Sequence, residues 1–306
     1  MAITIERIPW KGWENCFRLA NNTVELIVTE DIGPRIMRYA FIGQQNLFKE
    51  FTEQLGQTGE ATWTIRGGHR LWKGPEDRHA TYALDNGPIA IEASANGVTA
   101  VQPVEPETGL QKTMVITLAE EGTNVTVVHK IANRNLLPIE IAAWTPTVMA
   151  QGGLGVTGFP PRGTHPECLE PTNPLIMWAF TDLSDPRWKF TNKYLTLRQD
   201  PENPRPQKLG HFNAHTFGAY LLNGQMLVKQ YHPDPSKKHP EFGASFEIFT
   251  NADFLELETM GPFTTLHKDE VLTHTEHWSL HDGVMLAGVE DRALDEILLP
   301  VLRKSA

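Results

Sequence analysis

Alternation of apolar and polar side chains dominates the chain and predicts that most of it folds as β-strands. A period of two is the signature of a strand with one face buried. It is clear at residues 23–28 (TVELIV) and 124–131 (NVTVVHKI), and the turn-rich residues 120–123 predict a hairpin before the second of these. The other stretches expected to be strands are residues 3–9, 35–41, 113–118, 138–149, 217–222, 226–231, 244–249, 254–258 and 271–280.

One helix is expected, close to the C-terminus. Asp291 can cap its start, and Pro300 is expected to bend or shorten it. Many antiparallel strands followed by one short helix predict an all-β fold, a large antiparallel β-sandwich that occupies residues 1–306 as one domain. No repeat of 20–50 residues is present, which disfavours a propeller or a solenoid. The apolar positions with i, i+3, i+4, i+7 spacing on this helix are Leu294, Ile297, Leu298 and Val301.

Residues 160–206 interrupt the strand pattern. This stretch holds nine of the 22 prolines, and proline cannot donate a hydrogen bond to a sheet. We therefore expect a proline-rich loop excursion there. Long loops in compact domains often cover a functional site, and a surface decoration is the alternative.

Composition and charge narrow the classes of partner. The chain has 27 Lys and Arg against 37 Asp and Glu, a formal charge of −10, and no basic tract, which argues against nucleic acid. Two cysteines, Cys16 and Cys168, cannot build a disulfide framework. The first residues lack a signal-peptide pattern, and no apolar stretch has the length of a membrane helix. We expect a cytoplasmic protein with no membrane partner.

The densest cluster of chemically useful side chains lies at residues 66–77. Gly67 and Gly68 allow a turn or a close approach to a ligand, and charged residues surround Trp72. Charged groups can hydrogen-bond to the hydroxyls of a sugar while an indole covers its apolar face. The alternative is a solvated turn with Trp72 in the core. The candidate ligand-binding residues of this cluster are Arg66, Arg70, Trp72 and Glu76.

A second cluster lies at residues 254–263. Alternation places Phe254, Glu256 and Glu258 on one face of a strand, and the intervening leucines on the other. A carboxylate at a strand end inside a cleft is a candidate general base. Glutamates that simply face solvent are the alternative, and without a second clue the pattern favours it.

Two sets of histidines have spacings that invite a test for metal binding. His211 and His215 are four residues apart, and His274 and His277 are three apart. On helices such pairs would share a face. Residues 271–280 read as a strand, however, so His277 should point away from His274. We therefore expect no metal site and treat the histidines as hydrogen-bonded or exposed groups.

Together the two clusters resemble the galactose mutarotase-like superfamily, which includes the aldose 1-epimerases and hexose-phosphate epimerases. The matching motifs are GGHRLW at residues 67–72 and the closing block FLELETMGPFTTLHKDEVLTHTEHWSL at 254–280. Glu258 and Thr259 match the Glu-Thr of the family at the position of its catalytic base. Residues 65–68 resemble the arginine-glycine-glycine entry loop of the hexose-phosphate epimerases, so the resemblance indicates an uncharacterised branch with a β-supersandwich fold.

The resemblance implies exchange of sugar anomers without a cofactor. Glu258 takes the role of general base, and in the family a histidine on a mid-chain strand supplies the acid. Residues 141–147 match that strand but hold Trp144 and Thr145 and no histidine. His69 is then the expected acid, with His165 or His211 as substitutes. His211 is also expected to contact the substrate.

The expected partner is a small-molecule carbohydrate, and the sequence does not determine whether it is neutral or charged. The sequence also does not determine the oligomeric state. Two further functions stay open. One is a carbohydrate-binding protein that uses the same cleft without turnover, which the missing mid-chain histidine favours. The other is a sugar lyase or hydrolase on the same scaffold, assisted or not by a metal. Fold alone does not decide among these three.

Overall fold

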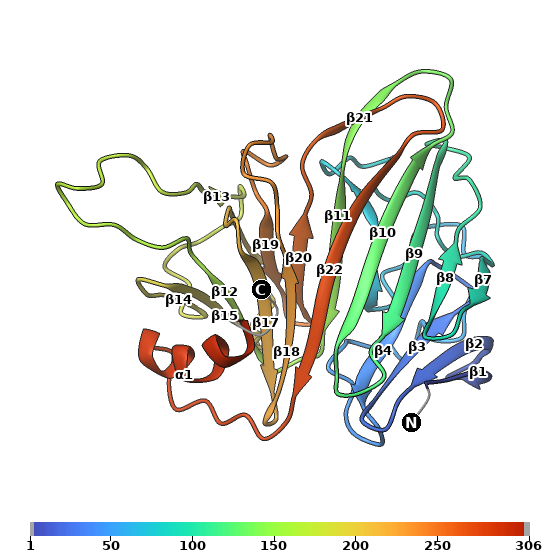
Figure 1. Cartoon of the computed structure of the whole chain (residues 1–306), viewed down its shortest axis with the longest axis horizontal. Coiled ribbons are helices and arrows are strands. Elements are labelled where there is room, and N and C mark those ends of the chain that lie inside the picture. Colours follow the sequence, from blue (N-terminus) through green and yellow to red (C-terminus); the bar gives the residue numbers. More distant parts are fainter. Residues whose placement is uncertain (1–2, 303–306) are drawn as a thin grey trace.

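Two large antiparallel sheets face each other in the computed structural model, which describes residues 3–302 (Figure 1). One sheet has twelve strands and the other has ten. The first runs β1(Thr4–Trp10), β2(Trp13–Ala20), β3(Val24–Thr29), β4(Arg35–Phe41), β5(Gly68–Arg70), β11(Ile139–Met149), β20(Leu255–Met260), β19(Phe246–Thr250), β16(Gln207–His211) and β13(Leu175–Met177), with β6(Trp72–Gly74) and β21(Thr264–Leu266) also paired to β11. The second runs β14(Trp188–Phe190), β15(Tyr194–Arg198), β12(Leu154–Gly158), β17(Thr216–Leu222), β18(Gln225–Tyr231), β22(Val271–His281), β10(Val125–Asn133), β9(Leu110–Leu118), β8(Gly97–Val101) and β7(Ala90–Ala93).

The main apolar core fills the space between the two sheets. Strands β9 and β10 alternate buried and half-buried residues along most of their length, as expected for strands that cover one side of a core. Met114 and Val127 from this sheet join Leu26 and Leu257 from the other in one cluster. The predicted fold class, a large antiparallel β-sandwich, is confirmed.

Each stretch with an alternating pattern contains a strand, and residues 120–123 do connect the antiparallel pair β9 and β10. Strands β2, β5, β6, β7, β8, β12, β16 and β21 were not predicted, nor were β13, β14 and β15 within the excursion. Of these, β5 and β6 are three residues each, and Gly67 and Gly68 at the start of β5 have positive φ angles. Such short strands are too brief to show a period.

The predicted C-terminal helix is present as α1(Asp291–Leu302) and lies beside β12, β15 and β17 (Figure 1). Leu294 and Leu298 are buried in a second apolar cluster with Val156 and Phe217. The helix continues past Pro300 to Leu302, so the proline does not end it at that point. Within residues 3–302, no helix is long and apolar enough to span a membrane.

Candidate functional site

One face of the twelve-stranded sheet gathers charged side chains from four neighbouring strands. On β20, Glu256 and Glu258 lie on this face while Leu255 and Leu257 enter the core, as the alternation predicted. Glu247 on β19 stands opposite Glu258 in the register of the sheet. Lys208 on β16 and Arg70 on β5 complete the group.

These groups form two sets of ion pairs, one around Arg70 and one around Lys208. Arg70 Nη2 donates to Glu256 Oε1 at 2.8 Å. Lys208 Nζ lies 2.7 Å from Glu247 Oε2 and 3.0 Å from Glu258 Oε2. The indole Nε1 of Trp144 donates a second hydrogen bond to Glu258 Oε2 at 2.7 Å, and Glu258 Oε1 has no hydrogen-bond partner. Glu258 is therefore held at one oxygen and unpartnered at the other.

Burial and neighbouring charges separate the pKa values of these groups. Burial raises the pKa of Glu247 to about 8, against the opposing effect of Lys208. Burial also raises the pKa of Glu256, although Arg70 opposes it and Glu258 adds to it. Burial alone would lower the pKa of Lys208, but the carboxylates of Glu247 and Glu258 outweigh it and raise that pKa. Lys208 thus stays a cation between them.

Aromatic side chains wall a pocket of about 310 Å³ above this set. Its polar lining comes from Arg70, Lys208, Glu256 and Glu76, and its aromatic lining includes Trp63, Trp72, Trp144 and Trp178. The Arg70 guanidinium lies over the ring of Trp72, at 4.1 Å from its centroid, and the Lys208 ammonium lies 4.7 Å from that of Trp178. Glu247 and Glu258 do not line the pocket and lie beneath its floor.

The proline-rich excursion supplies one wall of the pocket. Trp178 and Phe180 belong to it and line the cavity. The Thr181 hydroxyl accepts a hydrogen bond from Trp178 N at 2.9 Å and donates one to Lys208 O at 2.5 Å. This hydroxyl therefore ties the wall to the strand that carries Lys208.

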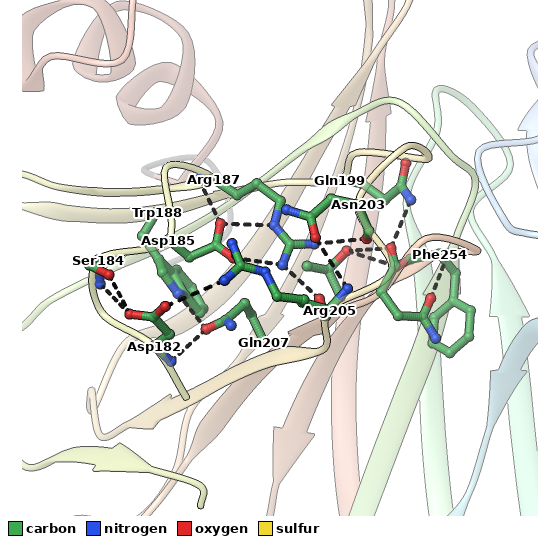
Figure 2. A network of polar contacts seen from close by, with 12 residues as sticks. Asp182, Ser184, Asp185, Arg187, Trp188, Gln199, Asn203, Arg205, Gln207 and Phe254 are labelled. Carbon is green, nitrogen blue, oxygen red and sulfur yellow. Dashed lines mark hydrogen bonds and ion pairs between the residues drawn. The ribbon is translucent and has the colours of Figure 1, made fainter. Parts of the chain in front are cut away.

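A buried polar network holds the next part of the excursion, as Figure 2 shows. Arg187 donates from Nε and Nη2 to the two carboxylate oxygens of Asp185, and Nη2 also donates to the carbonyl of Arg205 at 2.6 Å. Gln207 Oε1 accepts from Asp182 N and from Trp188 Nε1. The excursion has three short strands, β13, β14 and β15, and is otherwise irregular, as expected.

Arg70, Trp72 and Glu76 are the sequence-predicted residues that line the pocket, and Glu258 lies beneath them. Arg66 does not line it: its side chain is buried and pairs with Glu60 at 2.5 Å. His211 lies on the core side of its strand, where its Nε2 meets Thr157 Oγ1 at 2.9 Å.

His69 lies on the opposite face of the sheet from Glu258. It stands opposite Thr147 in the register of the sheet, and both side chains point into the space between the two sheets. Its Nδ1 meets Thr147 Oγ1 at 2.8 Å and its Nε2 meets His129 Nε2 at 2.7 Å. Neighbouring residues of an extended strand face opposite ways, so Arg70 reaches the pocket and His69 cannot.

The network around His69 also contains the one group of possible metal ligands found within residues 3–302. Ligand atoms of His69, His129 and Glu276 lie within 4.8 Å of one another. The Lys229 ammonium is the cation of this network. Its Nζ lies 2.8 Å from Glu276 Oε1 and also donates a hydrogen bond to Thr147 Oγ1. With both imidazoles neutral, one proton bridges the two Nε2 atoms, so these contacts are satisfied by hydrogen bonds alone.

The other histidines considered in the sequence do not converge. His165 is exposed in the excursion, and His215 is exposed at the loop after β16. On β22, His274 is buried and His277 is exposed, so their side chains point to opposite faces as expected for a strand. Neither of the two histidine pairs forms a metal-binding group among the described residues.

Sequence reasoning missed several residues of the pocket and of the charged set beside it. Lys208, Trp178 and Glu247 come from strands and loops far from both motifs, and nothing in their local sequence marks them. Trp144 was considered only as the residue that stands in place of a histidine. A buried glutamate such as Glu258 implies a nearby cation, but the sequence does not say which one.

Comparisons with known proteins were made at the level of sequence and of structure. No family model and no curated protein matches the sequence. Among solved structures, the fold is similar to a galactose mutarotase-like protein from Lactobacillus casei, with 11% identity over 87% of this chain and 100% of that chain and a TM-score of 0.56. It is also similar to a galactose mutarotase related enzyme from Lactobacillus acidophilus, with 7% identity over 88% of this chain and 98% of that chain and a TM-score of 0.55. At these identities the likeness concerns the fold.

Proposed function

We propose that the chain binds a sugar in the aromatic pocket and exchanges its anomers, with Glu258 as general base. The observation that carries this proposal is the position of Glu258. It lies directly below a pocket whose walls are aromatic and whose floor is charged, and its Oε1 lacks a partner. Indole faces cover the apolar side of a sugar ring, and Arg70, Lys208 and Glu256 offer donors and acceptors to hydroxyls.

The charges of the site favour a neutral sugar over a phosphorylated one. The site holds two cations, Arg70 and Lys208, and three carboxyl groups, Glu247, Glu256 and Glu258. Its formal charge with all five groups ionised is −1. Each of the two cations already has carboxyl partners within the site, so neither is free to bind a phosphate. Arg66, the residue that resembles a phosphate-binding arginine, is already paired with Glu60.

The proposed reaction needs one base at the C1 hydroxyl and one acid at the ring oxygen. Glu258 takes the proton of the C1 hydroxyl, the bond from C1 to the ring oxygen breaks, and Glu256 gives its proton to the ring oxygen. After rotation about C1–C2, the same steps in reverse close the ring as the other anomer. One proton returns to the C1 oxygen and the other returns to Glu256. No cofactor enters the reaction.

Environment assigns these two roles to the two carboxyl groups. Lys208 and Trp144 both donate hydrogen bonds to Glu258 Oε2, which leaves Oε1 free to accept a proton. The raised pKa of Glu256 favours its protonated form, and this residue lines the pocket. A carboxyl group that stays protonated is suited to the role of the acid.

Binding without turnover is the second candidate. The observation in its favour is that Glu258 is only 1% exposed and lies behind Lys208 and Trp144. Catalysis therefore requires the Lys208 or Trp144 side chain to move aside when the sugar binds, whereas binding in the pocket requires no such movement.

Titration with neutral, acidic and phosphorylated sugars, followed by NMR, tests the binding step that both candidates share. We expect a neutral sugar to bind, Trp72→Ala to weaken it about tenfold by removing one wall, and Glu258→Gln to change it only a few-fold. Tight binding of phosphorylated sugars only, or equal binding by Trp72→Ala, would place the ligand elsewhere.

A further inference from the structure

A second cavity, of about 800 Å³, adjoins the pocket at one end of the same sheet. Its lining comes from the loops that follow β6, β16 and β20 and from the loop that precedes β19. Among the lining residues are Pro75, Phe212, His239, Phe242 and Phe263. The function proposed above does not use this cavity.

Short stretches of chain link the lining of one cavity to that of the other. From Trp72 to Pro75, and from Lys208 to Phe212, the chain passes from the lining of one to the lining of the other within three or four residues. At the rise of a β-strand this is roughly 10–14 Å. The bridging segment is fixed by a hydrogen bond of 3.3 Å from Glu76 N to Glu241 Oε1.

The lining of the second cavity has the mixed character of a sugar-binding surface. Phe212 and Phe263 supply aromatic area, and several prolines supply flat apolar area. His239 is 4% exposed, its Nδ1 lies 3.1 Å from the carbonyl of Lys237, and its Nε2 has no hydrogen-bond partner. With its proton on Nδ1, the neutral ring offers Nε2 as an acceptor for a hydroxyl group.

Phe242 is a large apolar side chain held out into solvent at this cavity. It is 93% exposed. Its φ angle is +58°, and that of Glu241 is +49°, so two consecutive non-glycine residues have left-handed backbone. Such conformations cost free energy and are found preferentially at ligand-binding sites. An exposed ring beside a sugar pocket can stack on a sugar.

We infer that the second cavity binds a further sugar unit, so that the natural ligand is an oligosaccharide with a free reducing end rather than a free monosaccharide. This inference rests on the proposed function, because the first sugar ring occupies the aromatic pocket. The second ring lies against Phe242 and Phe263 and donates a hydroxyl hydrogen bond to His239 Nε2. Both cavities then contribute to the affinity for the oligosaccharide, and the second cavity provides the selectivity for its length.

Calorimetric titration with neutral and acidic mono- to tetrasaccharides that have a free reducing end tests this inference. Three forms of the full chain are compared: the wild type, Phe242→Asn and Met285→Asn. Asparagine removes the ring but tolerates left-handed backbone. Met285, 88% exposed and outside both cavities, is the matched control.

We expect the wild type to bind a di- or trisaccharide at least tenfold more tightly than its monosaccharide. Phe242→Asn should weaken the longer ligand about fivefold and leave the monosaccharide unchanged. Equal affinity for both lengths, or no effect of Phe242→Asn, overturns the second subsite while the proposed function stands. Absence of binding by any of these sugars contradicts the proposed function itself.

Discussion

At the scale of single residues, Trp144 limits which group of the pocket can act as the acid. In the families that the sequence resembles, a histidine acts from the comparable strand, whereas here an indole donates a fixed hydrogen bond to Glu258. An indole N–H does not transfer its proton near neutral pH, so the acid must come from another group. Glu256, with its raised pKa, is the group we propose.

Replacing Glu256 by glutamine tests this assignment. The acid must be protonated, so the wild-type rate of anomer exchange should fall as pH rises through the raised pKa of Glu256. Glu256→Gln should lose that alkaline limb and about 100-fold in rate. Glu76→Gln, at the rim of the same pocket, is the control and should keep the wild-type profile. An unchanged alkaline limb in Glu256→Gln would assign the acid to another group.

Lys208 is predicted to hold the buried carboxylates together. Lys208→Met leaves Glu247 and Glu258 without their ammonium partner and should destabilise the fold by about 3 kcal/mol near pH 8. The loss should shrink at acid pH, where the carboxylates take up protons. Chemical denaturation at both pH values measures it. Lys193→Met, which breaks an exposed pair with Asp295, should cost at most about 1 kcal/mol. An equal loss from both variants would contradict this role.

Local sequence pattern predicted part of the site and could not predict the rest. A period of two was enough to place Glu256 and Glu258 on one face. The same rule separates His69 from Arg70, but residues 66–77 were interpreted as a loop, and the strands there are only three residues long. Lys208 and Trp178 reach the pocket through long-range strand pairing, which no local pattern encodes.

At the scale of elements, the proline-rich excursion belongs to the pocket. Its composition predicted irregular structure and left its role open between a covering loop and a decoration. The structure shows that Trp178 and Phe180 line the cavity. The Asp185–Arg187 pair and Gln207 fix the segment that follows (Figure 2).

Thr181→Val should loosen this wall without unfolding the protein. The hydroxyl that links Trp178 N to Lys208 O is lost, at a cost of about 1 kcal/mol in hydrogen bonding. We expect sugar affinity to fall about fivefold while the melting temperature changes by a few degrees only. Thr264→Val, outside the pocket lining, is the control. Unchanged affinity in Thr181→Val would mean that the wall is not needed for binding.

At the scale of the whole molecule, a polar network lies between the two sheets. Burial keeps His129 neutral by lowering its pKa to about 4, and it lowers the pKa of His274 to about 3. In the unfolded chain these groups take up protons at the ordinary histidine pKa of about 6.5. The unfolded state therefore binds more protons between these values, and stability falls as pH drops through this window.

Proton uptake on unfolding between pH 4 and 6.5 measures this effect. His129→Gln should reduce the uptake by about one proton, because glutamine does not titrate. His277→Gln removes an exposed histidine and should leave the uptake unchanged. Glu247, whose raised pKa acts in the opposite sense, is present in both variants and cancels in the comparison. Equal uptake in the wild type and His129→Gln would show that this imidazole is charged in the folded protein.

In the proposed function, Glu258 is the base of an anomer exchange. NMR exchange spectroscopy on a bound neutral sugar, with the wild type and Glu258→Gln side by side, tests it most directly. We predict exchange between the α and β anomers faster than the spontaneous rate in the wild type, and at the spontaneous rate in the variant, with affinity kept within a few-fold. A sugar that binds to both forms and exchanges only spontaneously would contradict catalysis and leave a carbohydrate-binding protein.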